Sequence, residues 1–285
     1  MDPMNGIFSL YNLVDQNSKL DIYFTYTFKL EKSFIEVIIV DDGSLITISS
    51  VLEKHNFNFS FKIKVIRLEK QSGLSFARNI GAAASTKENL LFLDSDILLS
   101  DNYLKEHMDR LRFFPDTIFV SMKKNIEPNS IINNFSSILK GLETPDEYND
   151  KRLSRIFKKG QKWINRVSLD GVYEILSDTN SFKNFGYGRI INGYDLPSMV
   201  VGHNMSLNKD LFLRTCGFSD EFIGWGLEDT YFGVKAICIG SFVVPLLNCG
   251  VYHINHPPRS GSQNNKKREY LQNIKNYDNL LNKNI

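Results

Sequence analysis

The stretch LLFLDSDILL, residues 90–99, decides how the rest of the sequence is interpreted. An apolar run of this length, bounded by polar residues, is typical of a buried strand in a parallel sheet. Asp94, Ser95 and Asp96 interrupt the run before Ile97 resumes it. Because two carboxylates at the end of a buried strand cost free energy unless they are paired, the stretch predicts a cation bound there.

The composition of the 285-residue chain fits one large α/β domain or two small ones. Its 42% hydrophobic and 23% charged residues are ordinary, and a net charge of +2 is too small to indicate nucleic-acid binding. No apolar run approaches the roughly 20 residues that span a bilayer, and the N-terminus does not resemble a signal peptide. Three cysteines without a CxxC pair argue against a disulfide framework and a zinc knuckle. We therefore expect a cytoplasmic protein.

Three apolar segments in the first hundred residues run into polar ones, at 34–40, 61–68 and 89–93. An Ala-rich, helix-competent segment at 74–85 separates the last two. Strand, helix and strand at this spacing predict a βαβ unit and hence a parallel sheet. Since ligands bind beyond the carboxyl ends of such strands, we expect the acidic clusters there to face one crevice.

We therefore predict an α/β protein with a mostly parallel central sheet flanked by helices, in a single domain with a helical insert. Its expected parts are a first half at 1–122, the insert at 123–200, a second half at 201–262 and a polar tail at 263–285. The tail is expected to be a surface helix or a frayed end.

Asp94 and Asp96 are two apart on the predicted strand, so their side chains point to the same side and can address one cation. Oxygen ligands favour a hard divalent ion such as Mg²⁺ or Mn²⁺. The alternative is a turn that ends the strand, with a helix-capping Asp. We favour the metal.

Two further polar features follow the predicted strands. Asp41-Asp42-Gly43-Ser44 is an ordinary Asp-Gly turn with a Ser cap, or it offers a carboxylate to a nucleobase or a ribose hydroxyl. Arg78 lies early in a helix, where a cation opposes the helix dipole unless an anionic or polar ligand compensates. A nucleotide would compensate, but a solvated surface arginine is the alternative.

Residues 217–240, GFSDEFIGWGLEDTYFGVKAICIG, indicate a loop that leads into a helix. The expected buried stripe of this helix is Phe232, Ala236 and Ile239. Glu228 and Asp229 fall at its start, where acidic residues suit the helix dipole. A carboxylate beside Trp225, on a flexible Gly224-x-Gly226 loop, could also grip a sugar and remove a proton from its hydroxyl.

His253 and His256 lie three apart in VYHINHPP, a segment that two prolines favour as extended. Residues an odd number apart on a strand point to opposite faces, so we expect one of the two to join the site. A neutral imidazole would complete a mixed oxygen and nitrogen site that suits Mn²⁺ better than Ca²⁺. Each is otherwise a packing histidine.

Taken together, these stretches resemble a GT-A glycosyltransferase, with a family 2 catalytic domain and a family 7-like (galactosyltransferase-like) C-terminal region. EVIIVDDGS, GLSFARNIGAA and LLFLDSDILL match the three N-terminal landmarks of family 2 in order and spacing. GHNMSLNKDLFLRTCGF followed by GWGLEDTYF matches the galactosyltransferase-type C-terminal motif. The resemblance implies a metal-dependent, inverting transfer of a hexose or N-acetylhexosamine from a nucleotide-sugar, most often a UDP-sugar, to a glycan or glycolipid hydroxyl.

The resemblance also implies roles on the donor side, across residues 1–122. The residues expected to bind the nucleotide-sugar are Tyr11, Asp41 or Asp42, Arg78, Asp94 and Ser95. Asp96 would be the direct ligand of Mn²⁺ or Mg²⁺, with His253 and Asp94 beside it. The first strand departs from the family, because it is short and ends in Tyr11-Asn12 without a preceding Pro. That departure implies an altered nucleobase pocket or a weak first strand.

In the acceptor and catalytic half, Asp229 would be the general base, within its pair with Glu228. Trp225, Gly226 and Asn204 would contact the acceptor sugar. The metal would neutralise the leaving diphosphate while the base activates the hydroxyl. Retaining stereochemistry stays open, because related C-terminal regions occur in retaining families.

Other classes lack their motifs. A sugar-1-phosphate nucleotidyltransferase needs a Gly-rich phosphate loop, a dehydrogenase GxGxxG and a kinase-like NTPase GxxxxGK[ST], and none occurs. A carbohydrate-binding scaffold with the same fold would not need Asp96, Asp229 and His253 together. The basic stretch at 151–166 would suit an anionic acceptor at a membrane surface, a peptide acceptor is the main rival, and a solvated helix face is the plain alternative. The oligomeric state stays open.

Overall fold

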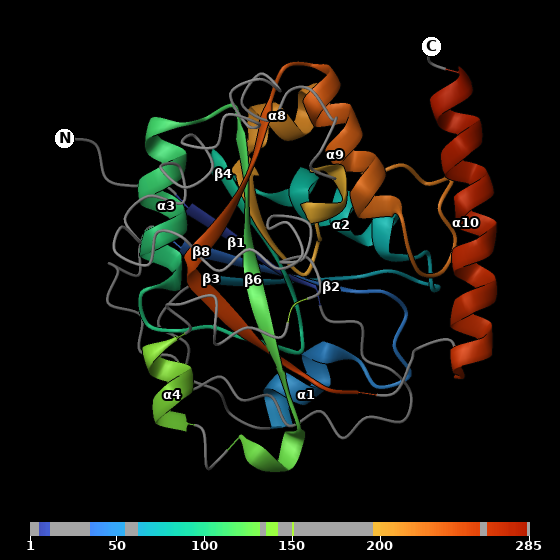
Figure 1. The fold of residues 1–285 in the computed structure, drawn as a ribbon. Coiled ribbons are helices and arrows are strands. Elements are labelled where there is room, and N and C mark those ends of the chain that lie inside the picture. Colours follow the sequence, from blue (N-terminus) through green and yellow to red (C-terminus); the bar gives the residue numbers. More distant parts are fainter. Residues whose placement is uncertain are drawn as a thin grey trace, which may run out of the picture.

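A central β-sheet runs through the molecule, with helices packed around it (Figure 1). The computed structural model describes residues 6–11, 35–54, 62–131, 135–141, 150, 196–256 and 261–283. Within these residues the sheet has eight strands in the order β3-β2-β1-β4-β7-β6-β8-β5.

The first four strands form a parallel block. They are β1 (Gly6–Tyr11), β2 (Ile35–Asp41), β3 (Lys62–Arg67) and β4 (Asn89–Asp94). β2 is buried along its whole length, which explains its continuous apolar run. β1 pairs with β2 on one side and with β4 on the other. Short as it is, β1 therefore lies inside the sheet, and the expected alteration of the nucleobase pocket stays a prediction.

The other half of the sheet is mixed. Its strands are β5 (Ile97–Leu98), β6 (Thr117–Ile126), β7 (Asn204–Asn208) and β8 (Phe242–Ile254). β7 is antiparallel to both β4 and β6, and β8 is parallel to β6 but antiparallel to β5. The expected insert boundary at residue 123 is wrong, because it cuts through β6.

Helices pack on the sheet where apolar positions recur along them. The α-helices are α1 (Ile48–Lys54), α2 (Leu74–Ala84), α3 (Tyr103–Phe113), α4 (Phe135–Lys140), α8 (Lys209–Arg214), α9 (Glu228–Cys238) and α10 (Gln263–Lys283). Short 3₁₀ turns are η2 (Pro128–Ser130) and η6 (Pro197–Met199). α2 contacts β1 and β2, α3 contacts β6, β7 and β8, and α9 contacts η6 and β8. The predicted helix at 74–85 is confirmed to within one residue.

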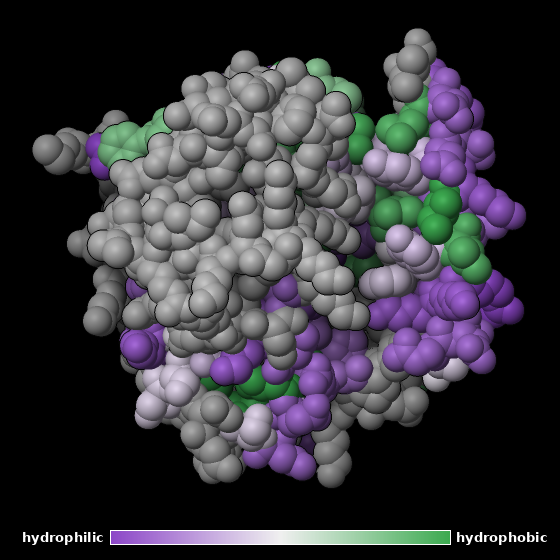
Figure 2. Space-filling view, in the orientation of Figure 1, coloured by the Kyte–Doolittle hydropathy of each residue, from purple (hydrophilic) through white to green (hydrophobic). Residues whose placement is uncertain are grey.

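α10 stands at the edge of the molecule, beside α9 (Figure 1). Its outward side is mostly hydrophilic, with a few hydrophobic residues along it (Figure 2). Of the two expectations for the polar tail, the surface helix is confirmed and the frayed end is wrong. No helix of the described residues is long and apolar enough to cross a membrane. All three cysteines are free, in line with the expected lack of a disulfide framework.

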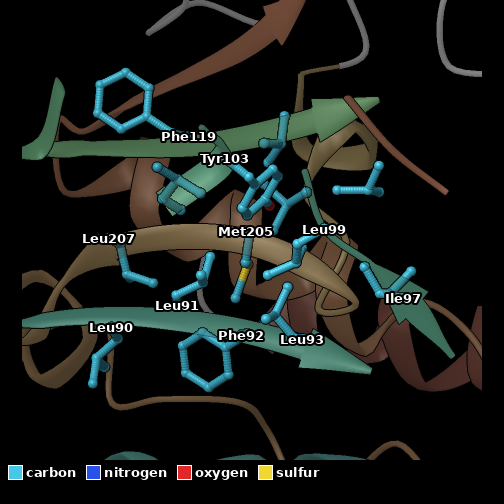
Figure 3. Packing of buried hydrophobic residues seen from close by; sticks show 14 of the residues in the cluster. Leu90, Leu91, Phe92, Leu93, Ile97, Leu99, Tyr103, Phe119, Met205 and Leu207 are labelled. Atoms are coloured by element: carbon cyan, nitrogen blue, oxygen red, sulfur yellow. The ribbon is translucent and has the colours of Figure 1, made fainter. Parts of the chain in front are cut away.

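The core fills the space between β4, β6, β7 and the helices that cover them (Figure 3). The apolar run that ends at Asp94 supplies the centre of the core. Its members are each no more than 3% exposed: Leu90, Leu91, Phe92 and Leu93. Met205 and Leu207 from β7 pack against them. Burial of this run fixes β4 in the sheet, and so fixes where the carboxylates that follow it must lie.

The predicted stripe of the helix after the Gly-Trp-Gly loop needs one correction. Phe232 and Ala236 are fully buried, as predicted, but Ile239 is 43% exposed. Ile239 falls just after α9 ends at Cys238, so it no longer follows the helical period. Ile237 is buried in α9 instead.

Candidate active site

Three strands of the parallel block end at the same edge of the sheet, and polar residues follow there. Tyr11, the last residue of β1, lies opposite Asp94, the last residue of β4. Asp41 ends β2 next to them in the sheet. The side chain of Tyr11 lies outside the described residues, and Ser95 is exposed after β4. Their predicted contacts with a nucleotide stay predictions.

Asp41 holds the turn that follows β2. Its carboxylate accepts hydrogen bonds from the backbone N–H groups of Ser44 (2.9 Å) and Ile48 (3.3 Å) and from Arg67 (2.6 Å). Burial raises the pKa of this carboxyl, but these hydrogen bonds outweigh burial and hold the pKa below its usual value. Asp41 is fully buried and bonded within the protein. Its predicted contact with a nucleotide stays a prediction.

Asp42 fixes the loop that leads into α2. It accepts hydrogen bonds from the backbone N–H groups of Ser72 (2.6 Å) and Gly73 (3.0 Å). Gly73 has φ +98° just before α2, a conformation that glycine adopts without strain. Asp42 therefore ties the end of β2 to the start of the helix that carries Arg78. It is also buried, and like Asp41 it stays a candidate for a nucleotide contact.

Arg78 is the centre of the site. Its Nη1 donates to Asp229 Oδ1 (2.7 Å) and Glu228 Oε1 (3.3 Å), and its Nη2 forms an ion pair with Asp94 Oδ1 (3.5 Å). The side chain is only 2% exposed, so the solvated surface arginine is wrong. One guanidinium thus joins the end of β4 to the start of α9. Its predicted contact with a nucleotide stays a prediction.

The guanidinium of Arg78 is enclosed on two sides. A Cβ on Gly202 would lie 2.2 Å from Arg78 Cζ, so only glycine leaves room for the guanidinium there. The ring of Phe218 lies 5.2 Å from Cζ, within cation–π distance. Both residues belong to the stretch 202–218 that contains β7 and α8, so this stretch encloses the arginine that holds the acidic pair.

The two acidic residues at the start of α9 differ in their surroundings. The Glu228 side chain is 7% exposed and its Oε2 accepts from the N–H of Gly226, whereas the Asp229 side chain is 18% exposed. Burial and the neighbouring Asp229 carboxylate raise the pKa of Glu228 to about 7. Both acids lie in the first turn of α9, as predicted, and Glu228 bonds backward to the loop. Asp229 is the more accessible of the two acids.

A second cluster of ligating side chains lies on the other side of the DSD turn. Pairing of β5 with β8 sets Ile97 opposite His253, and this register brings Asp96 beside that histidine. Asp96 Oδ2 lies 3.4 Å from His253 Nε2 and 2.9 Å from His256 Nε2. The three side chains each offer a ligand atom within 4.8 Å of the others. This is a candidate metal centre.

Two predictions about that centre are corrected. Both histidines join it rather than one, because β8 ends at Ile254 and His256 lies beyond it, where strand alternation no longer applies. Asp94 does not join the cluster, because β4 ends there and the following turn directs Asp96 elsewhere. Asp94 faces Arg78 instead.

The donor set fits a divalent ion such as Mn²⁺. Asp96 Oδ1 and His253 Nδ1 are buried and have no hydrogen-bond partner among the described residues. Burial raises the pKa of Asp96, but the two histidines lower it by more, so the net pKa lies below its usual value. The group is therefore a carboxylate at neutral pH. Burial lowers the pKa of His253 to about 4, against the opposing charge of Asp96, and leaves a neutral imidazole. Metal ligation requires these protonation states.

Asn204 lies inside the sheet. It is fully buried on β7, and its Oδ1 accepts a hydrogen bond from the backbone N–H of Ser121 at 3.0 Å. This hydrogen bond joins β7 to β6. The predicted contact of Asn204 with the acceptor sugar stays a prediction. A sequence pattern could not separate these roles, because an exposed and a buried Asn look alike in a strand of five residues.

Trp225 and Gly226 lie in the loop before α9, as predicted. The Trp225 side chain is partly exposed, but α10 covers it: Lys266 Nζ lies 4.0 Å from its ring centroid and Tyr270 packs at 5.7 Å. The loop is held rather than freely flexible, and the helix that holds it was expected to be only a polar tail. No motif in the sequence signals this contact.

The basic stretch at 151–166 lies outside the described residues, with most of the expected helical insert. Its proposed part in acceptor choice therefore stays a prediction.

Two family profiles match the chain. The profile of glycosyl transferase family 2 matches residues 13–172, and that of the N-terminal domain of galactosyltransferase matches residues 191–256. The two matches follow one another along the chain in the order that the motifs suggest.

Relatives among characterised proteins cover most of this chain. Hyaluronan synthase of Pasteurella multocida is 26% identical over 246 residues, which are 84% of this chain and 23% of that protein. Polypeptide N-acetylgalactosaminyltransferase 5 of Caenorhabditis elegans is 34% identical over 218 residues, 75% of this chain and 31% of that protein. The chain thus spans less than a third of the length of either relative.

Solved structures share the fold. GalNAc-T7, solved with UDP, GalNAc and Mn²⁺, superposes with a TM-score of 0.59 at 16% identity, covering 94% of this chain and 48% of that one. TarS of S. aureus, residues 1–349 with UDP, gives a TM-score of 0.54 at 17% identity over 88% of this chain and 61% of that one. The expected GT-A fold is confirmed.

Proposed function

This chain belongs to glycosyltransferase family 2, and from that premise we propose that it transfers a hexose or N-acetylhexosamine from a UDP-sugar to an acceptor hydroxyl, with inversion and with a divalent metal. The observation that carries the proposal is the contact of one buried guanidinium with Asp94, Glu228 and Asp229. The guanidinium links two parts of the site. One is the edge of the sheet, where a nucleotide would bind; the other is the acidic pair, which could activate a nucleophile.

Asp229 is the proposed base. It is the more exposed acid of the pair, and its hydrogen bond to Arg78 orients it. In the reaction, the acceptor oxygen attacks the anomeric carbon, the bond from that carbon to the UDP oxygen breaks, and Asp229 accepts the hydroxyl proton. Asp229 accepts this proton as the new bond forms.

Glu228 has a different part in the proposal. With a pKa of about 7, Glu228 is partly protonated at neutral pH. Its partial neutralisation relieves repulsion among the three acids around Arg78. Its Oε2 also holds the N–H of Gly226 and so connects the loop to the pair. Glu228 therefore shapes the site, while Asp229 accepts the proton.

Asp96, His253 and His256 would hold the metal. When bound there, Mn²⁺ or Mg²⁺ would supply positive charge that stabilises the leaving diphosphate. The neutral imidazole and carboxylate of this cluster favour Mn²⁺ over Ca²⁺. GalNAc-T7 was solved with UDP and Mn²⁺, which supports this choice of donor and ion.

The main acceptor in the proposal is a glycan or glycolipid. A peptide acceptor is a second candidate, because a polypeptide N-acetylgalactosaminyltransferase is the relative with 34% identity. The basic stretch at 151–166 would favour an anionic acceptor, including one at a membrane surface. Neutralising Lys158, Lys159 and Lys162 tests that part: unchanged acceptor kinetics and membrane association would remove it.

The test measures UDP release from UDP-glucose, UDP-N-acetylglucosamine and UDP-N-acetylgalactosamine, with Mn²⁺ or with chelator. Each donor is offered to water alone, to hyaluronan and chondroitin oligosaccharides, and to Ser- and Thr-containing peptides. We expect one donor to react, only with metal, and Asp229→Asn to lower the rate by roughly 10²–10⁴-fold.

Binding is measured separately by thermal unfolding with UDP and Mn²⁺, where ligand at about a hundred times its dissociation constant adds roughly 2.7 kcal/mol of stability. Asp229→Asn should keep this stabilisation. Stabilisation by UDP without turnover of any donor would instead support a carbohydrate-binding scaffold of the same fold. Product stereochemistry, read by NMR, decides between inversion and retention.

A further inference from the structure

The last helix of the chain holds the loop that precedes the acidic pair. α10 lies beside α9 (Figure 1), and side chains from four successive turns of it reach the backbone or rings of residues 221–231. The residues of α10 that make these contacts did not stand out in the sequence, where the segment was predicted only as a polar surface helix or a frayed end.

Asn273 makes the central contacts. It is fully buried although the rest of α10 is partly or fully exposed. Its Nδ2 donates to the backbone carbonyls of Ile223 (3.1 Å), Trp225 (3.3 Å) and Gly226 (3.0 Å). The amide has two N–H groups, so one of them is shared between two of these carbonyls. Together they fix the path of the loop, because each buried carbonyl left without a donor would cost free energy.

Close packing adds to these hydrogen bonds. A Cβ on Gly224 would lie 2.7 Å from Glu269, and one on Gly226 would lie 2.8 Å from Tyr270. Glu269 also accepts from the N–H of Trp225 at 3.2 Å. Both glycines have positive φ, of +76° and +108°, so the loop adopts a shape that other residues would resist.

The loop leads directly into the acids. Gly226 accepts from Asn273 through its carbonyl and donates its N–H to Glu228. Leu227, the next residue, has φ +71°, a strained conformation for a leucine that the surrounding contacts must hold. α9 then begins at Glu228, with Asp229 bonded to Arg78. Asn273 is therefore two hydrogen bonds away from Glu228.

We propose that Asn273 is a positioning residue for the reaction: by fixing the backbone of residues 223–226, it holds the acidic pair of α9 against Arg78. The inference rests on the proposed function, since it assigns Asn273 to the acceptor and catalytic side of that site. Asn273 itself bonds to the carbonyls of Ile223, Trp225 and Gly226, which belong to the acceptor and catalytic side of the proposed site. We therefore expect its replacement to affect turnover and to leave binding of the nucleotide unchanged.

The experiment compares Asn273→Asp with Asn279→Asp in the full chain. The first places a carboxylate against three carbonyls; the second makes the same change at an exposed position of the same helix. UDP release from UDP-N-acetylglucosamine and UDP-N-acetylgalactosamine is measured with Mn²⁺, together with the affinity for UDP. Asn273→Ser, which removes the amide without adding charge, replaces the first variant if that variant does not fold.

We expect kcat to fall by up to roughly 10²-fold in Asn273→Asp, the cost of a small misplacement of a catalytic group, with the affinity for UDP unchanged. Asn279→Asp should match the wild type in both. A general loss of structure would weaken UDP binding and kcat together, and that result would overturn the proposal. So would an unchanged kcat.

Hydrogen exchange of residues 221–229 in the same variants needs no substrate. Faster exchange in Asn273→Asp but not in Asn279→Asp is expected. A wild-type chain that turns over no donor would contradict the proposed function and, with it, the catalytic part of this inference, whereas unchanged exchange would contradict the hold of Asn273 on the loop. The two failures are thus distinguished.

Discussion

The guanidinium of Arg78 on α2 donates a 2.7 Å hydrogen bond to the carboxylate of Asp229 on α9, across 151 residues of sequence. The same guanidinium reaches Asp94 at the end of β4. Two halves of the chain, each matched by a different family profile, therefore meet at one buried cation. Because the contact is buried, removing one partner is strongly destabilising, and the surrounding packing fixes the orientation of the two groups.

Replacement of Arg78 should show that cost. Arg78→Met removes the cation from two acids that stay mostly buried, so we expect the free energy of unfolding to fall by about 3–5 kcal/mol in urea titrations at pH 7. Arg214→Met is the control, since it breaks exposed pairs with Asp210 and Asp116 and should cost at most about 1 kcal/mol. Equal losses in the two variants would contradict a buried network at Arg78.

Gly202 should be intolerant of even one added methyl group. Its Cβ would lie 2.2 Å from Arg78 Cζ, so Gly202→Ala forces the guanidinium to shift and should cost about 1–3 kcal/mol of stability. The cost should shrink when Arg78 is already Met, because the clash is then with a smaller, flexible side chain. Additive losses in the double variant would mean that Gly202 acts through some other neighbour.

The parallel block of the sheet, and the meeting of its acidic strand ends at one edge, could be predicted from strong local patterns. The buried run before Asp94 fixed one strand, and the order of the acidic strand ends placed them at one edge. What failed were predictions that extend a local pattern past the end of an element. Ile239 lies beyond α9, and His256 lies beyond β8, so periodicity gave the wrong side for both.

Burial of polar residues was the other gap. Asp41, Arg78 and Asn204 are polar residues near a proposed site, yet each is buried and bonded within the protein. Each has a partner on another element, 26 residues away for Asp41, 83 for Asn204 and 151 for Arg78, and no pattern along one segment encodes such pairs. The hold of Asn273 on the catalytic loop was missed for the same reason.

The ligands of the metal centre can be tested by substitution, because the sequence predicted Asp94 as a ligand and the cluster in the structure does not include it. Asp96→Asn, His253→Gln and His256→Gln should each weaken Mn²⁺ binding by more than the roughly 10–100-fold that loss of an outer-shell partner costs. Asp94→Asn should leave Mn²⁺ affinity unchanged in the absence of nucleotide, because Asp94 faces Arg78. Isothermal titration of the full chain measures all four. Equal losses for Asp94→Asn and Asp96→Asn would restore both carboxylates as direct ligands.

Glu228 should make stability depend on pH. Burial and Asp229 raise its pKa from 4.5 to about 7, so the folded state holds a proton that the unfolded state releases between these values. The free energy of unfolding should therefore fall as pH rises through this window, and Glu228→Gln, which cannot ionise, should escape the fall. Relative to the wild type, the variant should gain on the order of 3 kcal/mol between pH 5 and pH 8, at about 1.4 kcal/mol per pKa unit. Urea titrations across that range measure the difference, with the exposed Glu221→Gln as control. If the stability of Glu228→Gln relative to the wild type stays constant or falls as pH rises, the raised pKa of Glu228 is contradicted.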